Sequence, residues 1–190
     1  MGIAEEMGRR QRAISVSEFF EKNRHLLGYD NKAKAMLMIV KEAVDNGLDA
    51  CDEAGILPEI YVRIKEAGPD KHQIAIRDNG PGIVREQIPK IFGRLLYGSK
   101  FHRLKQNRGQ QGLGISCAVL YSQLTTGSPT TIVSSTGDGK THRYQLRIDV
   151  ARNRPIIVET SAEEGEVWHG VDVGFVAECT YRENKQSVIE

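Results

Sequence analysis

The chain has 190 residues, a formal net charge of +1, 39% hydrophobic residues and 27% charged residues. This length and composition fit one globular domain with a real core and exclude a disordered chain. The near-neutral charge predicts no nucleic-acid partner by itself, and the longest apolar run is too short for a membrane-spanning helix.

The cysteines and histidines exclude two other classes of site. Cys51, Cys117 and Cys179 are widely separated and odd in number, and the five histidines show no metal-ligand spacing. The cysteines therefore make neither a disulfide framework nor a zinc site, which favours a reducing, cytoplasmic setting. The N-terminus also lacks the apolar segment of a signal peptide, so we expect no membrane association.

The first part of the sequence carries helix signals. A capping-box pattern begins at Ser15 and predicts a short helix, preceded by an extended arm at residues 1–14. Asn31 is suited to cap a long helix that runs to about Glu53 and stops before Gly55. We assign residues 15–190 to one domain.

The second part is richer in strands. Alternating polar and apolar residues predict strands at 59–66, 73–77, 130–135, 142–149, 156–160 and 168–179. The last strand places Val171, Val173, Phe175 and Ala177 on one face. Two further helices are expected at 84–93 and 115–123. This order predicts an α+β, two-layer fold, with a mixed or antiparallel sheet and helices on one face.

The long helix carries a polar stripe. Glu42, Asp45, Asn46 and Asp49 recur at helical spacing and share one face. Most such stripes are solvated surface. Two observations favour a ligand instead: the stripe contains no cation, and Gly47 lies in mid-helix, where glycine costs about 1 kcal/mol relative to alanine. A glycine there suits the close approach of another group.

A glycine-rich turn follows the second predicted strand. Asp78 ends that strand and begins the sequence Asp-Asn-Gly-Pro-Gly, which finishes at Gly82. For the turn residues alone, a plain hairpin loop is the better explanation. A carboxylate held at a strand end is also able to accept a hydrogen bond from the exocyclic amine of a nucleobase. Glycine residues beside it leave room for a flat ring against the backbone.

A second glycine-rich segment precedes the helix expected at residues 115–123. The sequence GQQGLG occupies residues 109–114, and no Asp or Glu occurs between Glu86 and Asp138. Backbone N–H groups at a helix N-terminus, with lysine and arginine nearby, suit a polyphosphate. A solvated loop without a ligand is the alternative. The segment is not a Walker P-loop, because the GxxxxGK[ST] pattern is missing.

These three features in this order resemble the Bergerat-fold (GHKL) ATPases, a superfamily that includes gyrase B, heat-shock chaperones, histidine kinases and MutL. Each motif alone is weak, but the ordered set is specific. The phrases ISVSEFFEKNRHLLGYDN, KEAVDNGLDACDEAGILPEI, YGSKFHR and RGQQGLGIS further resemble the B subunits of type IIB DNA topoisomerase VI. The likeness runs from about Gln11 to the C-terminus.

The resemblance implies a role for particular residues. Glu42 is the expected general base, Asn46 the expected ligand of Mg²⁺, and Asp78 the expected partner of the adenine amine, with Gly82 lining the adenine site. Asp45 and Asp49 match the family motif and receive only supporting or structural roles. The expected lid over the triphosphate of ATP comprises Ser99, Lys100, Arg108, Gly109, Gln110, Gln111, Gly112, Leu113, Gly114 and Ile115.

The resemblance also implies an activity and partners. ATP binding is expected to dimerise two B subunits within an A2B2 complex, and to gate the passage of one DNA duplex through a break made by the A subunit. That activity implies association with the nucleoid. In the family, a helical insert and a transducer domain follow this region, and the transducer domain supplies a lysine to the γ-phosphate. The sequence up to Glu190 includes neither of them, so we expect slow or absent turnover by this chain alone. The alternative is a stand-alone GHKL nucleotide-binding module, or another GHKL ATPase without strand passage.

One position departs from the family pattern. The family has a Gly-Thr pair near its last strand, in which the threonine supports the adenine-binding aspartate. The corresponding pair here is Gly170 and Val171. Because valine has no hydroxyl, we expect either weaker nucleotide binding or a substitute hydroxyl elsewhere.

Overall fold

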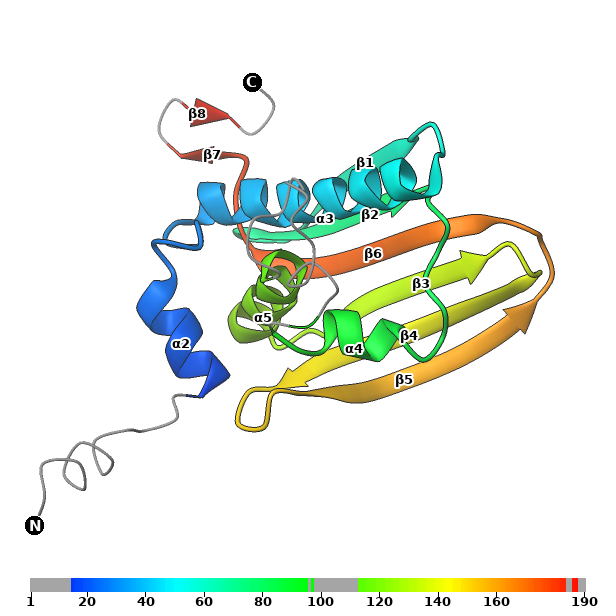
Figure 1. The fold of residues 1–190 in the computed structure, drawn as a ribbon. Helices are drawn as coiled ribbons and strands as arrows, with labels where there is room; N and C mark the ends of the chain where they lie inside the picture. The colour runs from blue at the N-terminus through cyan, green and yellow to red at the C-terminus, as the bar shows by residue number, and fades with distance from the viewer. Residues whose placement is uncertain (1–14, 96, 98–112, 184–185, 188–190) are drawn as a thin grey trace, which may run out of the picture.

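The computed structural model describes residues 15–95, 97, 113–183 and 186–187 (Figure 1). The expected arm at residues 1–14 lies outside this range. In chain order the elements are α2 (Val16–Asn23), α3 (Lys32–Ala54), β1 (Ile60–Gly68), β2 (Lys71–Asp78), α4 (Ile88–Phe92), α5 (Gly114–Thr126), β3 (Thr130–Thr136), β4 (Lys140–Asp149), β5 (Arg154–Glu164), β6 (His169–Glu178), β7 (Arg182–Glu183) and β8 (Gln186–Ser187). None of the helices described is long and apolar enough to cross a membrane.

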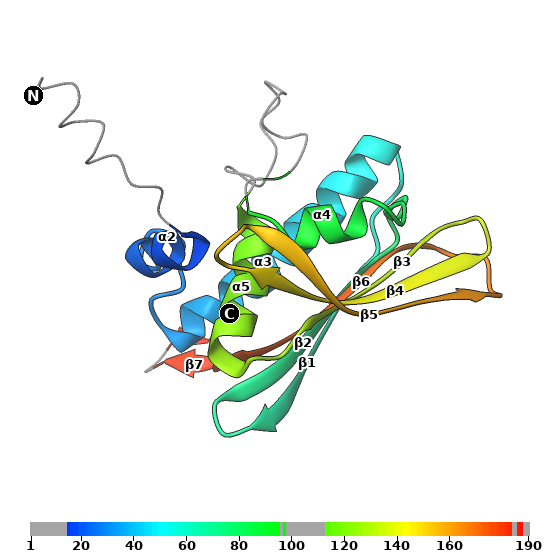
Figure 2. The same cartoon turned by 90° about the horizontal axis from the view of Figure 1, so that it is seen from below.

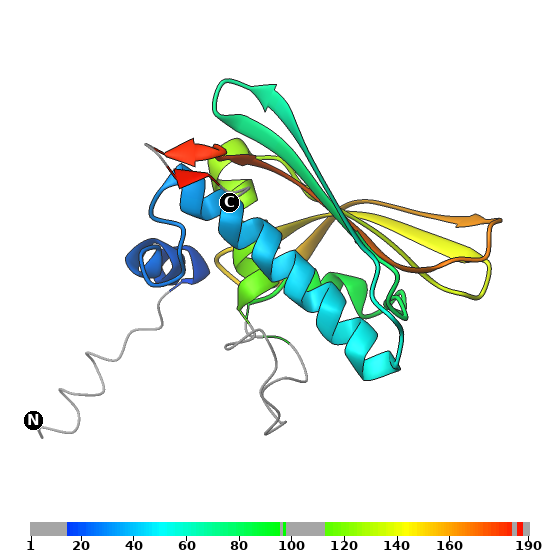
Figure 3. The same ribbon diagram turned by 90° about the horizontal axis from the view of Figure 1, so that it is seen from above.

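One six-stranded sheet forms the first layer of the fold. Its strand order is β1-β2-β6-β3-β4-β5, and every neighbouring pair is antiparallel. The helices α3, α4 and α5 cover one face of this twisted sheet (Figures 2 and 3). The structure therefore confirms the predicted α+β fold with helices on one face, and shows the main sheet to be antiparallel rather than mixed.

The long helix α3 begins and ends where the sequence predicts. The Asn31 side chain accepts a hydrogen bond from the backbone N–H of Lys34 at 2.7 Å, which caps the N-terminus. At the C-terminus Gly55 adopts the left-handed conformation, with φ of 68°. The capping box at Ser15 is also present, because its side chain accepts from the backbone N–H of Glu18.

Helix α5 is the central helix of the core. Every residue from Ser116 to Ser122 is buried, and the helix packs on both α3 and β6. Its hydroxyls hydrogen-bond to the part of β6 that lies beyond the pairing with β3. Ser122 Oγ donates to the carbonyl of Val176, and Tyr121 Oη donates to the carbonyl of Glu178, each at 2.6 Å. These bonds fix α5 along the sheet.

The inner face of β6 carries the apolar residues expected from its periodicity. Val171, Val173, Phe175 and Ala177 are all buried, and they join one core cluster with residues of α3 and α5. From Asp172 to Glu178 the residues that alternate with them are only partly buried. This pattern is typical of an antiparallel sheet with one packed face.

Two expected elements differ in extent. The helix predicted at residues 84–93 is shorter, because only Ile88–Phe92 is helical and Pro89 lies in its first turn. Pro89 favours a helix start at that point, so the preceding residues form a turn instead. The strand predicted at 156–160 is longer and spans Arg154–Glu164, since it pairs with β4 along its whole length.

Substitution of Gly47 by alanine is expected to lower the free energy of unfolding. A methyl group at Gly47 would lie 2.9 Å from Cβ of Asp78 and 2.9 Å from Cδ1 of Ile60. Overpacking of this kind costs about 1–3 kcal/mol, while the better helix propensity of alanine returns only about 1 kcal/mol. Chemical denaturation measures the change; a more stable Gly47→Ala variant would contradict the close approach of α3 to β2.

Candidate functional site

The candidate site is built around the carboxylate of Asp78, at the end of β2. Its Oδ1 atom accepts two backbone hydrogen bonds, from Gly80 at 2.9 Å and from Val171 at 3.2 Å. The first donor belongs to the turn that follows β2, and the second to the neighbouring strand β6. These two bonds fix the plane of the carboxylate.

The surroundings of Asp78 raise its pKa. Burial is the largest cause, because it disfavours the charged form, and the charge of Asp172 acts in the same direction. The hydrogen bonds from Gly80 and Val171 lower the pKa and offset part of the effect. A carboxylate with a raised pKa is a strong hydrogen-bond acceptor while it remains ionised.

Glycines make the close approach to Asp78 possible. A methyl group at Gly170 would lie 2.1 Å from the carbonyl oxygen of Asp78, and one at Gly80 would lie 2.9 Å from its Oδ1. Gly47 provides the same clearance from helix α3. The group that Gly47 admits is therefore the side chain of Asp78, which brings α3 to the site.

Asn79 fixes the turn that follows Asp78, a role that the sequence reading missed. Its Oδ1 accepts from the backbone N–H of Glu59 at 2.8 Å and from the thiol of Cys51 at 3.4 Å. Its Nδ2 donates to the carbonyl of Leu57 at 3.0 Å. The sequence identified Asn79 only as a turn residue, because its partners are 20 to 28 residues away in the chain.

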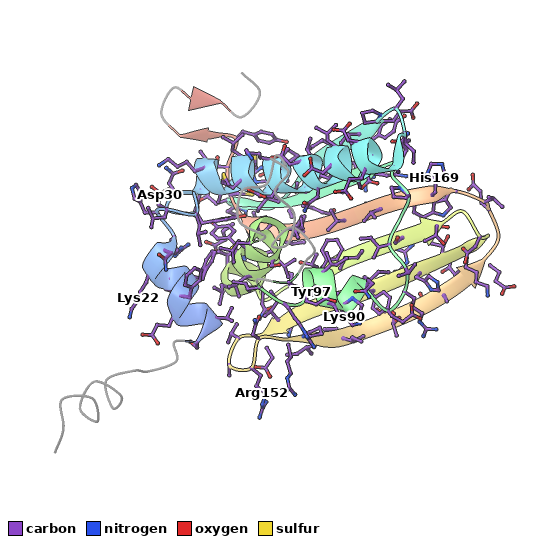
Figure 4. The ribbon with its side chains drawn as sticks, viewed as in Figure 1. Lys22, Asp30, Lys90, Tyr97, Arg152 and His169 are labelled. Atoms are coloured by element: carbon purple, nitrogen blue, oxygen red, sulfur yellow. The ribbon has the colours of Figure 1, made fainter. Side chains whose placement is uncertain are left out.

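His169 holds the next residue of the same turn. Its Nδ1 atom donates to the carbonyl of Gly80 at 2.8 Å, and Figure 4 shows His169 at the start of β6. Two residues further on, Gly82 has a φ of 75°, and a methyl group there would lie 2.0 Å from the carbonyl oxygen of Ser135. Only glycine fits at Gly82 without displacing β3.

Glu42 lies on α3, five residues before the contact of Gly47 with Asp78, and is beside the N-terminus of α5. A methyl group at Gly114, the first residue of α5, would lie 1.7 Å from Oε2 of Glu42. The N-terminus of α5 has no side-chain cap. The first amides and the dipole of α5 therefore face a region that already holds a carboxylate.

Two buried groups lie within the electrostatic influence of Glu42. The pKa of the Cys117 thiol is raised to about 12, first by burial and then by the charge of Glu42. The pKa of Tyr29 is raised well above its usual value, mainly by burial, with Cys117 and Glu42 adding to the effect. Both side chains are almost fully buried, so Glu42 has packed core on this side.

Asn46 lies on α3 between Glu42 and Gly47, the residue at which the helix contacts Asp78. It follows Glu42 by one turn and directly precedes Gly47, and both Glu42 and Asn46 are half-buried. Five residues of α-helix span about 7.5 Å, so α3 sets the separation between Glu42 and the end of β2. Among the described residues, no group of three or more His, Cys, Asp or Glu residues is placed to hold a metal ion.

The expectation of a stripe without a cation is wrong. Lys41 donates to Oδ2 of Asp45 at 2.7 Å, across one turn of α3. Asp49 is buried rather than aligned along an open face. The four residues therefore do not form one exposed acidic surface, and the ion pair with Lys41 engages Asp45.

The structure describes only the C-terminal end of the expected lid, residues 113–115, and Tyr97, which precedes the lid in the chain. Ser99, Lys100, Arg108, Gly109, Gln110, Gln111 and Gly112 lie outside the described residues. Leu113 is buried and occupies the N-cap position of α5, while Gly114 and Ile115 form its first turn. On the other side Tyr97 Oη donates to Gln87 Oε1 at 3.0 Å, beside α4 (Figure 4).

Comparison with known proteins places this arrangement in a class. Residues 31–152 match the family described as histidine kinase-, DNA gyrase B-, and HSP90-like ATPase. That match covers α3, the turn after Asp78, and α5. The chain therefore belongs to this ATPase family and is an ATP-binding domain.

Two similar relatives carry a more particular name, the B subunit of type 2 DNA topoisomerase 6. The chain is 56% identical over 186 residues to the relative from Archaeoglobus fulgidus, and 51% identical over 190 residues to the one from Methanosarcina barkeri. These alignments cover 97% and 99% of this chain, but only 31% of each relative. The resemblance seen in the sequence is thus confirmed for a domain that spans about a third of its relatives.

A solved structure supports the fold alone. The ATPase region of Saccharomyces cerevisiae topoisomerase II matches with a TM-score of 0.52 and 16% sequence identity. The match covers 78% of this chain and 41% of the other. It confirms the architecture that the sequence predicts.

Asp78→Asn is expected to weaken binding of an ATP analogue by about 10- to 150-fold. The asparagine Oδ1 atom is able to keep both backbone hydrogen bonds, but Nδ2 would then present a donor to the adenine amine that the family resemblance leads us to expect at Asp78. A hydrogen bond to a charged group contributes roughly 1.5–3 kcal/mol. Fluorescence titration with a labelled ATP analogue measures the loss.

The same variant has a predicted effect on stability and on pH dependence. Because the pKa of Asp78 is raised in the folded chain, its charge opposes folding at neutral pH, and Asp78→Asn should not lower the melting temperature without nucleotide. Nucleotide affinity of the unsubstituted chain should decrease as pH falls, starting above the usual range of aspartate. Normal nucleotide binding by Asp78→Asn would contradict the adenine role.

Gly114→Ala is expected to lower ATP turnover by about 100-fold, because its methyl group must displace the Glu42 carboxylate, and a misplacement of about 1 Å is able to cost that much. Gly165→Ala is the matched control, since a methyl group there meets nothing within 4 Å. The measurement is the steady-state rate of ATP hydrolysis of each variant. Equal activity of the two variants would show that Glu42 is not adjacent to α5 during turnover.

Proposed function

We propose that this chain is the ATP-binding and ATP-hydrolysing domain of a topoisomerase VI B subunit. The observation that carries the proposal is the identity of 50% or more to curated relatives of that name over nearly the whole chain. The site geometry agrees with it. Asp78, Asn46 and Glu42 follow one another along the junction of α3 with β2 and α5, which suits a nucleotide that lies across this junction.

Each residue has a proposed role. Asp78 accepts a hydrogen bond from the adenine amine, and Gly82 lines the same pocket. Glu42 orients and deprotonates the attacking water. Phosphoryl transfer requires this base and donors for the charge that develops on the phosphate oxygens, and the first turn of α5 supplies backbone donors.

Asn46 is the proposed magnesium ligand. Mg²⁺ in nucleotide sites keeps several waters and is held by one or two protein oxygens plus phosphate oxygens. One amide oxygen from α3 fits that donor set better than an all-protein cage, which the described residues do not form. Bound Mg²⁺ neutralises charge on the phosphates. The lid residues Ser99, Lys100 and the segment 108–115 are proposed to enclose the triphosphate.

At the level of the complex, we propose that ATP binding dimerises two B subunits within an A2B2 assembly with the A subunit. Dimerisation then gates the passage of one DNA duplex through a double-strand break made by the A subunit, and hydrolysis resets the gate. This activity would bring the protein to the nucleoid. The domain lies at residues 15–190, with residues 1–14 as an arm toward the dimer partner.

Calorimetric titration with Mg²⁺ and a non-hydrolysable ATP analogue tests the proposal on this chain directly. We expect saturable binding that is stronger for the ATP analogue than for the GTP analogue, because Asp78 would face a carbonyl oxygen on guanine. A mass measurement in the same solutions tests dimerisation. Absence of any nucleotide binding would contradict the proposed function.

Glu42→Ala is expected to bind nucleotide normally but to lower kcat by about 100-fold or more in the complete subunit, since a general base contributes about 10²–10⁴-fold. Asp45→Asn is the matched control one turn away, and its engagement with Lys41 predicts nearly normal turnover. Single-turnover ATP hydrolysis measures both variants. Unimpaired hydrolysis by Glu42→Ala would remove Glu42 from the chemistry.

A further inference from the structure

The peptide unit that joins Gly170 to Val171 is hydrogen-bonded at both ends. Its N–H group donates to Oδ1 of Asp78 at 3.2 Å, and its carbonyl accepts from the hydroxyl of Ser134 at 3.2 Å. The two groups belong to one planar amide. Any contact that fixes the carbonyl therefore also fixes the direction in which the N–H points at Asp78.

Ser134 is well placed to fix that amide. Its side chain is fully buried, and its Oγ accepts from the backbone N–H of Ile83 at 2.8 Å. Its proton has two acceptors, the carbonyls of Gly170 and Ile83, each at 3.2 Å. The hydroxyl thus ties β6 to the residue that directly follows Gly82.

The strand register puts the relevant residues in one row. Asp78 pairs with Val171 across β2 and β6, and Val171 pairs with Ser134 across β6 and β3. All three belong to the helix-covered face of the sheet. Val171 brings no hydroxyl to this row, and Gly170 cannot carry a side chain, because its φ is 133° and a methyl group would overlap the Asp78 carbonyl.

We propose that Ser134 is a positioning residue of the adenine site, and that it replaces, through the Gly170–Val171 amide, the hydroxyl that a threonine at Val171 would supply. The inference rests on the proposed function of Asp78. Hydrogen bonds in such a chain polarise one another, so the serine both orients the N–H and strengthens its bond to the carboxylate. Ser134 itself does not touch the nucleotide.

The chain contains a matched control for this inference. Ser135 is the next residue of β3 and is equally buried, but its hydroxyl has no hydrogen-bond partner among the described residues. It faces the opposite side of the sheet, because successive strand residues alternate. Ser134→Ala and Ser135→Ala therefore remove the same atom from neighbouring buried positions, and only the first breaks the chain to Asp78.

The experiment measures the Kd of this 190-residue chain for non-hydrolysable analogues of ATP and GTP. Ser134→Ala should weaken ATP-analogue binding by about 10-fold, the equivalent of one unmade hydrogen bond. The ratio of ATP-analogue to GTP-analogue affinity should fall by a similar factor, because the guanine base gains nothing from an oriented Asp78. Ser135→Ala should leave both constants unchanged.

Val171→Thr is measured alone and in combination with Ser134→Ala, as a double-mutant cycle. Alone it should change the affinity little, because Ser134 already orients the amide. In the Ser134→Ala background it should recover most of the lost affinity, since the new hydroxyl reaches Asp78 directly. Equal losses in the two serine variants, a parallel loss of ATP- and GTP-analogue binding, or no recovery by Val171→Thr would each overturn the positioning role.

Folding is checked separately by thermal unfolding without nucleotide. If Ser134→Ala does not fold, Ser134→Cys keeps the volume but donates only weakly, and the same loss of base discrimination is then expected from it. Failure of the proposed function would be visible earlier, as absence of nucleotide binding by the unsubstituted chain. Failure of the present inference leaves that binding intact and shows only in the serine variants.

Discussion

The buried carboxylate of Asp78 is the constraint on which the rest of the site depends. It lies where β2 ends, takes two backbone hydrogen bonds through one oxygen, and leaves its second oxygen toward helix α3. Burial raises its pKa, so the protein must hold an ionised group against a desolvation cost. Two amides and the glycines Gly47, Gly80 and Gly170 meet that requirement, because only residues without a side chain let three backbone segments approach so closely.

Helix α3 transmits this constraint to the rest of the site. Because it contacts the end of β2 at Gly47, the position of Glu42 is set by the rise of the helix rather than by a loop. Helix α5 then lies against Glu42 at Gly114. A carboxylate placed by two packed helices keeps a fixed distance from Asp78. This rigidity is what phosphoryl transfer to water requires.

Strand β6 connects the site with the core. At its far end, beyond the pairing with β3, hydroxyls of α5 donate to carbonyls of β6, as Ser122 does to Val176. At its near end, the Gly170–Val171 amide joins Ser134 to Asp78. The same strand carries the apolar row against which α5 packs. The same strand therefore contributes both to the packing of the core and to the geometry of the site.

The sequence by itself determined the local elements and the family. The cap at Asn31, the periodicity of β6 and the glycine turn after Asp78 act over a few residues, so they are readable without a fold. Only the tertiary structure decided what these elements contact. Asn79 binds the α3–β1 connection, Lys41 engages Asp45, and Ser134 donates to the carbonyl of Gly170. These contacts depend on side-chain direction and strand register, and pairs tens of residues apart leave no periodic signal in a single sequence.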